Sequence, residues 1–189
     1  MSKQKQLQQL KTRMENDISL PLRETATHLV FGEGNPDADL YFLGEAPGRF
    51  EDVQGRPFVG QAGKLLDKLL ASIGMKREDV YISNMVRFRP PNNRPPTPAE
   101  LTAFEPYVSE ELEIVQPKLV VTLGRFALEK FLPGEKISKI HGEMRPVEWH
   151  GKTVRLFPMY HPSAALRSSS VRQALEEDFK KIPEVLAKI

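Results

Sequence analysis

A glycine-rich segment from Gly44 to Gly63 has the composition of a loop that surrounds a ligand. It holds five glycines and two prolines beside Glu45, Glu51, Asp52 and Phe58. Small residues let a backbone approach a ligand closely. The glycine spacing does not fit a dinucleotide fingerprint, and no Gly-Lys-Ser/Thr ends the segment as in a Walker phosphate loop. Taken alone, the segment is more typical of a turn-rich connection.

A histidine followed by small residues forms a second candidate for chemistry. The stretch from Tyr160 to Arg167 reads Tyr-His-Pro-Ser-Ala-Ala-Leu-Arg, with His161 where a strand is expected to end. Taken alone, such a histidine is typical of a structural role. Together with the glycine-rich segment, it indicates a ligand site.

Four apolar runs predict the strands that must position these residues, at 40–43, 80–83, 119–123 and 154–159. Helical periodicity is expected over 3–16, 64–73, 125–131 and 171–188, with Pro183 kinking or splitting the last helix. Thr97-Pro98-Ala99-Glu100 predicts the capped start of a further helix that ends near Val115.

Alternating strands and helices predict an α/β fold in which helices cover both faces of a parallel sheet. Ligands of such sheets bind at the carboxyl ends of the strands. The four strands lead into the glycine-rich segment, the proline-rich segment 84–98, Gly124 and the segment that begins at His161. The informative loops should therefore meet at one edge of the sheet.

The composition bounds the class of protein. The chain has 189 residues, no cysteine and a net charge of +2, which indicates one domain over 1–189, with residues 1–20 forming a peripheral N-terminal helix. Disulfides and thiolate metal sites are excluded. No apolar run approaches a membrane span, and the polar N-terminus lacks the apolar core of a secretory signal. A cytoplasmic monomer is expected.

Three ordered motifs resemble the family 4 uracil-DNA glycosylases. They are Gly-Glu-Ala-Pro-Gly from Gly44 with Gly-Arg-Pro-Phe-Val-Gly-x-Ala-Gly from Gly55, then Asn-x-Val-x-x-Arg-Pro-Pro-x-Asn-Arg from Asn84, then His-Pro-Ser from His161. The resemblance implies a three-layer α/β/α sandwich with a central four-stranded parallel sheet, in agreement with the pattern of elements. It also implies hydrolysis of the bond between uracil and deoxyribose in DNA, which leaves an abasic site.

The resemblance assigns a role to each pocket residue. Phe58 corresponds to the aromatic that stacks on the flipped base, and Asn84 to the amide that matches N3–H and O4 of uracil. His161 corresponds to the donor that stabilises the leaving uracil anion at O2. Glu45 orients or activates water, or stabilises the cationic sugar. Ala46 takes the position of a water-activating aspartate in other uracil glycosylases and is counted with the substrate-binding residues.

DNA contacts are expected around the histidine motif and the proline-rich segment. Leu166 and Arg167 are placed to enter the gap that the flipped nucleotide leaves in the duplex. Local positive charge for the phosphates comes from arginines, which reconciles DNA binding with the small net charge. The expected DNA-binding residues are Arg87, Ser163, Leu166 and Arg167, with Arg89, Arg94 and Arg172 as further cations. The partner is uracil-containing DNA, single- or double-stranded.

The resemblance also implies a four-cysteine iron–sulfur cluster that this chain cannot bind. The corresponding positions are Asp17, Leu20, Phe88 and Phe104. Three of the four are bulky and apolar, so we expect them to pack together in the space of a cluster. No cofactor is expected.

Two rival functions remain open. A relative that bonds covalently to the uracil site carries a basic insertion with a histidine after the second strand, whereas this chain reads Arg-Pro-Pro-Asn-Asn-Arg-Pro-Pro there. A non-catalytic uracil-binding protein is the other rival, because the aspartate is replaced by Ala46. The retained Glu45, Asn84 and His161 favour the enzyme.

Overall fold

A computed structural model describes all 189 residues. The sheet has six strands in the order β1-β3-β2-β4-β6-β5. Their bounds are β1 Glu33–Gly34, β2 Leu40–Gly44, β3 Tyr81–Asn84, β4 Leu119–Leu123, β5 Arg145–Trp149 and β6 Lys152–Met159. The four central strands β3, β2, β4 and β6 are parallel, which confirms the predicted parallel sheet.

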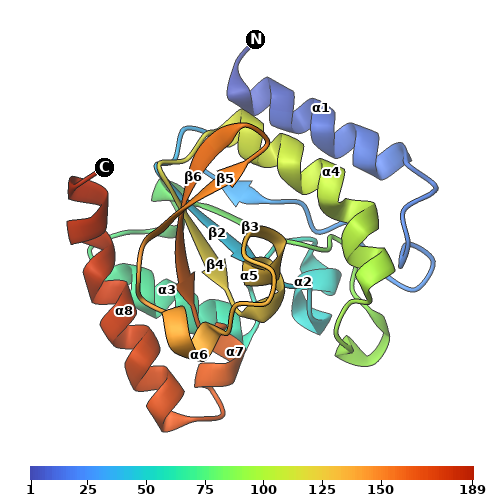
Figure 1. The fold of residues 1–189 in the computed structure, drawn as a ribbon. Helices are drawn as coiled ribbons and strands as arrows, with labels where there is room; N and C mark the ends of the chain where they lie inside the picture. Colours follow the sequence, from blue (N-terminus) through green and yellow to red (C-terminus); the bar gives the residue numbers. More distant parts are fainter.

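Helices cover both faces of the sheet, as Figure 1 shows. Helices α1 (Lys3–Asn16) and α4 (Pro98–Val115) lie side by side over one face, and α3 (Gln61–Ser72) and α8 (Ser169–Ala187) cover the other. The shorter helices are α2 (Arg49–Gln54), α5 (Arg125–Phe131), α6 (Ile137–Ile140) and α7 (Pro162–Ala165), with 3-10 turns at Arg77–Asp79 and Pro91–Asn93. The predicted α/β/α sandwich is confirmed.

Each central strand contributes side chains to two separate hydrophobic clusters. In β2, Tyr41 and Leu43 face the cluster under α1 and α4, whereas Leu40 and Phe42 face the cluster under α3 and α8. This alternation follows from the two-residue repeat of a strand, and it explains why a strand covered on both faces is apolar throughout. Helix α1 adds the apolar stripe of Leu7, Leu10 and Met14 to the first cluster.

The two edge strands were not predicted. β1 is two residues long and pairs antiparallel with β3, inside a segment whose glycines and proline indicated only a turn. β5 pairs antiparallel with β6 through a hairpin in which His150 and Gly151 both have positive φ. Pro146 lies in β5, and an edge strand tolerates a proline because one of its sides needs no ladder hydrogen bonds.

Helix ends follow local sequence, with one exception. Thr97 and Glu100 form the predicted capping box at the start of α4, with Thr97 N–H donating to Glu100 Oε2 at 2.8 Å. The exception is α8, where Pro183 was expected to kink or split the helix. The proline does not split it, because the helix continues to Ala187. Ile182 beside this proline is fully buried, so packing against the sheet holds the last turns in place.

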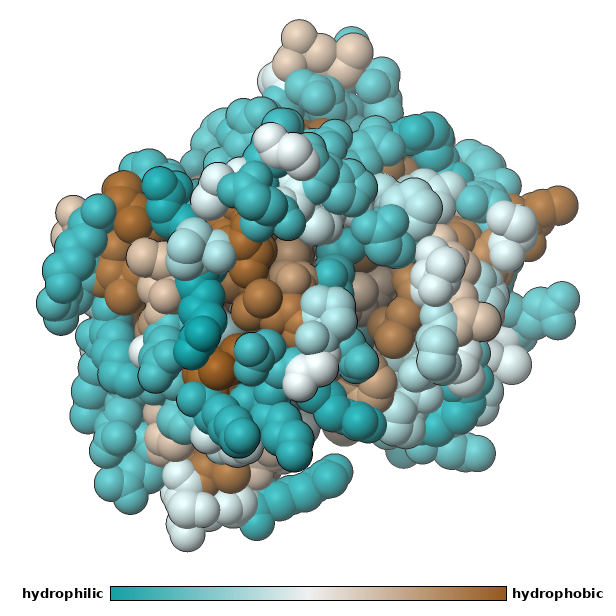
Figure 2. Space-filling model, in the orientation of Figure 1, coloured by the Kyte–Doolittle hydropathy of each residue, from teal (hydrophilic) through white to brown (hydrophobic).

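The outer face is polar for the most part. Figure 2 shows hydrophilic residues over most of one face, with hydrophobic residues grouped in separate patches. None of the helices has the length and apolar content of a membrane-spanning segment.

Candidate active site

The residues expected to do chemistry meet at the carboxyl edge of the parallel strands. Gly44 at the end of β2 pairs with Asn84 at the end of β3, and Leu123 of β4 pairs with Met159 of β6. A cavity of about 490 Å³ opens at this edge. Of the predicted site residues, it is lined by Glu45, Ala46, Phe58, Asn84, His161, Ser163 and Arg167.

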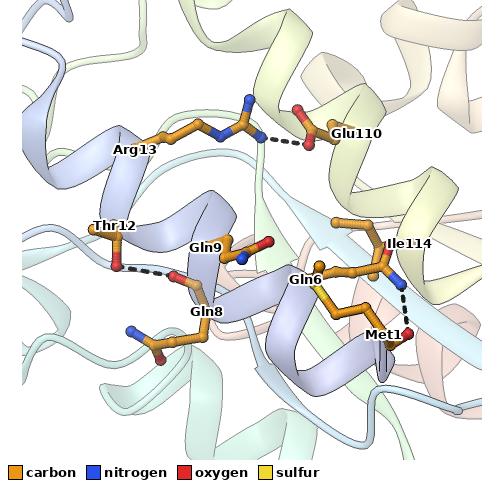
Figure 3. Close-up of a pocket in the computed structure, with 8 residues that line it drawn as sticks. All are labelled: Met1, Gln6, Gln8, Gln9, Thr12, Arg13, Glu110 and Ile114. Carbon is orange, nitrogen blue, oxygen red and sulfur yellow. Dashed lines mark hydrogen bonds and ion pairs between the residues drawn. The ribbon is translucent and has the colours of Figure 1, made fainter.

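A larger hollow of about 830 Å³ lies between α1 and α4 and is not at the strand ends (Figure 3). An ion pair between Arg13 and Glu110 crosses it, and most of its other lining side chains are neutral. It does not bring a carboxylate, a histidine and an aromatic side chain together, as the cavity at the strand ends does.

Phe58 is held in an unusual backbone conformation. Its φ is +51°, a region that L residues rarely adopt. Arg77 fixes the peptide groups on each side, donating to the carbonyl of Pro57 at 2.7 Å and to the carbonyl of Phe58 at 2.9 Å. A Cβ on Gly63 would lie 1.9 Å from the Phe58 carbonyl oxygen, so only glycine fits there. The buried Phe58 ring therefore has a defined place, stacked on the His161 ring at 5.6 Å.

Glu51 ties the glycine-rich segment together. Its Oε1 accepts hydrogen bonds from the N–H groups of Val59 at 2.9 Å and Gly60 at 2.8 Å, and its Oε2 accepts one from Gly48 N–H at 3.1 Å. Neither Glu51 nor Arg77 was predicted to have a function. The available signal for Glu51 was an acidic residue three positions after Gly48, which is the spacing of a capping box.

Asn84 presents an amide to the cavity from the end of β3. The residue is buried, and its Oδ1 has no hydrogen-bond partner. A Cβ on Gly44 would lie 2.5 Å from that oxygen and 2.5 Å from Phe58 Cζ, so Gly44 makes room for both side chains. Leaving a buried acceptor unpaired costs free energy. A ligand N–H group that reached Asn84 Oδ1 would recover that cost.

The hydrogen bonds of His161 define which ring nitrogen carries the proton. Nδ1 accepts from the backbone N–H of Ser163 at 3.1 Å and lies 2.8 Å from the Ser163 hydroxyl. A backbone N–H can only donate, so Nδ1 is unprotonated and Nε2 carries the hydrogen. Burial lowers the pKa of His161 to about 4, against a smaller opposing effect of Glu51. The ring is therefore neutral near pH 7 and offers one donor, Nε2–H.

Glu45 follows β2 directly and is half-buried. Burial raises the pKa of its carboxyl group, and the charge of Arg125 acts in the opposite direction. The next residue, Ala46, also lines the cavity. An aromatic face, an amide, one N–H donor and a carboxylate together suit a planar heterocycle attached to a sugar.

Comparison with known proteins decides the family. The sequence profile of the uracil DNA glycosylase superfamily matches residues 31–187. The chain belongs to this superfamily. A type-4 uracil-DNA glycosylase of Archaeoglobus fulgidus is 48% identical over 172 residues, covering 88% of this chain and 86% of the relative. One of Thermotoga maritima is 43% identical over 178 residues, covering 93% and 92%. The resemblance to family 4 is confirmed.

The residues predicted to bind DNA divide into two groups, those at or beside the cavity and one that is buried inside the protein. Ser163 and Arg167 line the cavity, and Leu166 is 47% exposed beside it. Arg87 is different, because its side chain is fully buried and forms two hydrogen bonds of 2.8 Å with the buried Glu111 of α4. The prediction that Arg87 binds DNA is wrong, since its guanidinium cannot reach a phosphate.

The further arginines of that prediction differ in their partners within the protein. Arg94 pairs with Glu100 at 2.7 Å, and Arg172 pairs with Glu176 at 2.9 Å. Arg89 donates to Asn93 Oδ1 at 2.7 Å and has no carboxylate partner. The positive charges of Arg94 and Arg172 are therefore partly neutralised within the protein, whereas Arg89 has only a neutral partner.

The positions that the family resemblance aligned with cluster cysteines do not fit an iron–sulfur cluster. Leu20, Phe88 and Phe104 lie in one hydrophobic cluster, as predicted, with the two phenylalanine rings edge to face at 6.1 Å. Asp17 lies outside this packing and accepts a hydrogen bond from the Tyr107 hydroxyl at 2.6 Å. The place of a cluster is occupied by side chains that offer no thiolate.

Proposed function

We propose that this protein is a uracil-DNA glycosylase, which hydrolyses the N-glycosidic bond of deoxyuridine in DNA, releases uracil and leaves an abasic site. The observation that carries the proposal is the unpartnered, buried Oδ1 of Asn84 between Phe58 and the end of β2. Membership of the superfamily supports the same reaction.

Recognition follows from the chemistry of the cavity. The target nucleotide leaves the base stack, and its base lies against the Phe58 ring. Asn84 Oδ1 accepts from uracil N3–H, and the Asn84 amino group donates to O4. Cytosine has an acceptor at N3 and a donor at the exocyclic amine, so an Asn84 side chain fixed in this orientation would have both its carbonyl and its amino group unpaired. That mismatch excludes cytosine.

Cleavage develops negative charge on uracil and positive charge on the sugar. The Nε2–H group of His161 donates to O2 and stabilises the leaving anion without a proton transfer, because the ring is already neutral. The Glu45 carboxylate stabilises the cationic sugar or takes a proton from the attacking water. Ala46 adds no functional group. Glu51 also lines the cavity, but its carboxylate already accepts three backbone hydrogen bonds, which leaves Glu45 to act.

DNA is held around this pocket. Arg167 binds a phosphate near the flipped nucleotide, Leu166 fills the gap in the stack, and Ser163 orients His161 through Nδ1. We further propose that the protein is a monomer and acts in the cytoplasm on single- or double-stranded DNA. Light scattering after size-exclusion chromatography tests the monomeric state.

One assay separates the enzyme from its rivals. The protein is incubated with a single-stranded uracil oligonucleotide, treated with alkali and examined for strand cleavage. Cleavage is expected, with His161→Ala and Asn84→Ala each slower by about 10²-fold or more. Asn16→Ala, at an exposed position at the end of α1, is the matched control and keeps the wild-type rate.

Other outcomes would overturn the proposal. A band shift without cleavage would identify a non-catalytic binder. An SDS-stable adduct would identify a protein that is covalently trapped on its substrate.

A further inference from the structure

An exposed phenylalanine stands at the mouth of the cavity. Phe50 of α2 is 57% exposed, and its ring lies near Gly60, where an added Cβ would be 3.5 Å from Phe50 Cδ2. Val53 of the same helix is 61% exposed but does not line the cavity. Single exposed apolar residues are common on proteins. The position of Phe50 therefore matters more than its exposure.

Two unpaired cations line the same cavity. Arg49 precedes Phe50 at the start of α2, and Arg167 follows shortly after the end of α7. Neither guanidinium forms an ion pair with a carboxylate, in contrast to Arg94, which is paired with Glu100. Free arginines bind phosphate oxygens and position a nucleic-acid strand. The cavity lining thus combines an exposed aromatic ring with two unpaired positive charges.

Resting on the proposed function, we infer that Phe50 is a second stacking surface, which holds the base next to the flipped uracil in single-stranded DNA. Arg49 binds the phosphate between the two nucleotides. Stacking of bases on aromatic side chains, combined with positive charge along the backbone, is how proteins bind single strands without reading their sequence. In a duplex the neighbouring base is already stacked and paired, so Phe50 gains much less there.

The inference gives Phe50 a role that differs from that of Phe58. Phe58 is buried inside the cavity and contacts the base that is removed, whereas Phe50 lies at the exposed mouth of the cavity and contacts a base that stays in the strand. Loss of Phe50 should weaken binding of single-stranded substrate by about tenfold, which equals about 1.4 kcal/mol. The rate of bond cleavage at saturating enzyme should stay the same.

The test compares Phe50→Ala with its control Val53→Ala on two single-stranded oligonucleotides. One has normal nucleotides on each side of uracil, and the other has abasic analogues there. Fluorescence anisotropy gives the Kd, and single-turnover cleavage gives the rate. On the normal strand Phe50→Ala should bind about tenfold more weakly, Phe50→Trp should bind as tightly as wild type, and Val53→Ala should be unchanged.

On the strand with abasic neighbours, wild type and Phe50→Ala should bind equally. An equal loss on both strands, or no loss on the normal one, overturns the inference. So does a concentration-dependent dimer that disappears in Phe50→Ala, because the ring would then contact a second copy of this chain. If wild type releases no uracil from either strand, the proposed function fails, and the anisotropy comparison still decides whether Phe50 stacks on a base.

Discussion

Replacing Arg87 with methionine tests the largest difference between the sequence analysis and the structure. Both side chains of the Arg87–Glu111 pair are fully buried. Burial alone would lower the pKa of Arg87, but the charge of Glu111 outweighs it and the pKa is raised. The hydroxyl of Tyr41 also donates to Glu111, and the Arg87 guanidinium lies 5.5 Å from the Phe31 ring. The pair therefore joins α4 to the sheet.

The expected cost follows from the charge that is left behind. Arg87→Met leaves the Glu111 carboxylate buried with tyrosine hydroxyls as its only donors. Breaking a buried ion pair in this way costs about 3–5 kcal/mol. For a chain of this length, each kcal/mol lowers Tm by about 2–4 °C, so the fall should be roughly 6–20 °C. The double variant Arg87→Met/Glu111→Gln removes both charges and should be more stable than the single variant.

Denaturation in guanidinium chloride measures the differences in free energy of unfolding, and thermal denaturation measures Tm, with circular dichroism as the signal for both. Arg89→Met is the matched control, because Arg89 has no carboxylate partner and is hydrogen-bonded to Asn93. DNA binding at several salt concentrations is measured in parallel. Arg87→Met with wild-type stability and a smaller salt dependence of binding would refute the buried pair, since Arg87 would then contact a phosphate.

Three further predictions concern the core and the site. Phe88→Ala should lose about 3–5 kcal/mol of stability, and the purified wild type should contain no iron by mass spectrometry. An unaffected variant or stoichiometric iron would contradict the inference that apolar side chains replace the iron–sulfur cluster. Gly63→Ala should cost about 1–3 kcal/mol and slow uracil release, because its Cβ would displace the Phe58 carbonyl, and a crystal structure with Phe58 unmoved would contradict this. Because the pKa of Glu45 is raised, kcat/KM should fall as the pH is lowered, and this fall should begin at a higher pH than for an ordinary glutamate, while His161, with a pKa of about 4, stays neutral. Glu45→Gln should be slower and lack this fall, and an unchanged pH profile would assign the fall to another group.

The local sequence predicted the four central strands and the start of α4, because residues close together in the chain determine these elements. A continuous apolar run such as residues 119–123 indicates a strand covered on both faces, and Thr97 with Glu100 specifies where α4 begins. The edge strand β5 escaped prediction because Pro146 argues against a strand, and only its place at the edge of the sheet makes the proline harmless. Pro183 does not split α8 for a related reason, since packing of α8 outweighs the cost of the proline.

The order of the motifs along the chain, each after a predicted strand, was enough to bring Glu45, Asn84 and His161 to one edge of the sheet. Residue type alone could not decide which polar groups face the cavity and which are paired inside the protein. Arg87 lies three residues from Asn84, yet it is buried because Glu111, on a helix 24 positions later, meets it across the sheet face. Asn84 keeps its Oδ1 unpaired because Gly44 and Phe58 leave no donor beside it. Most helices and strands depend on neighbours in the chain, whereas strand β5, the last turns of α8, burial and side-chain pairing depend on residues that only the folded structure brings together.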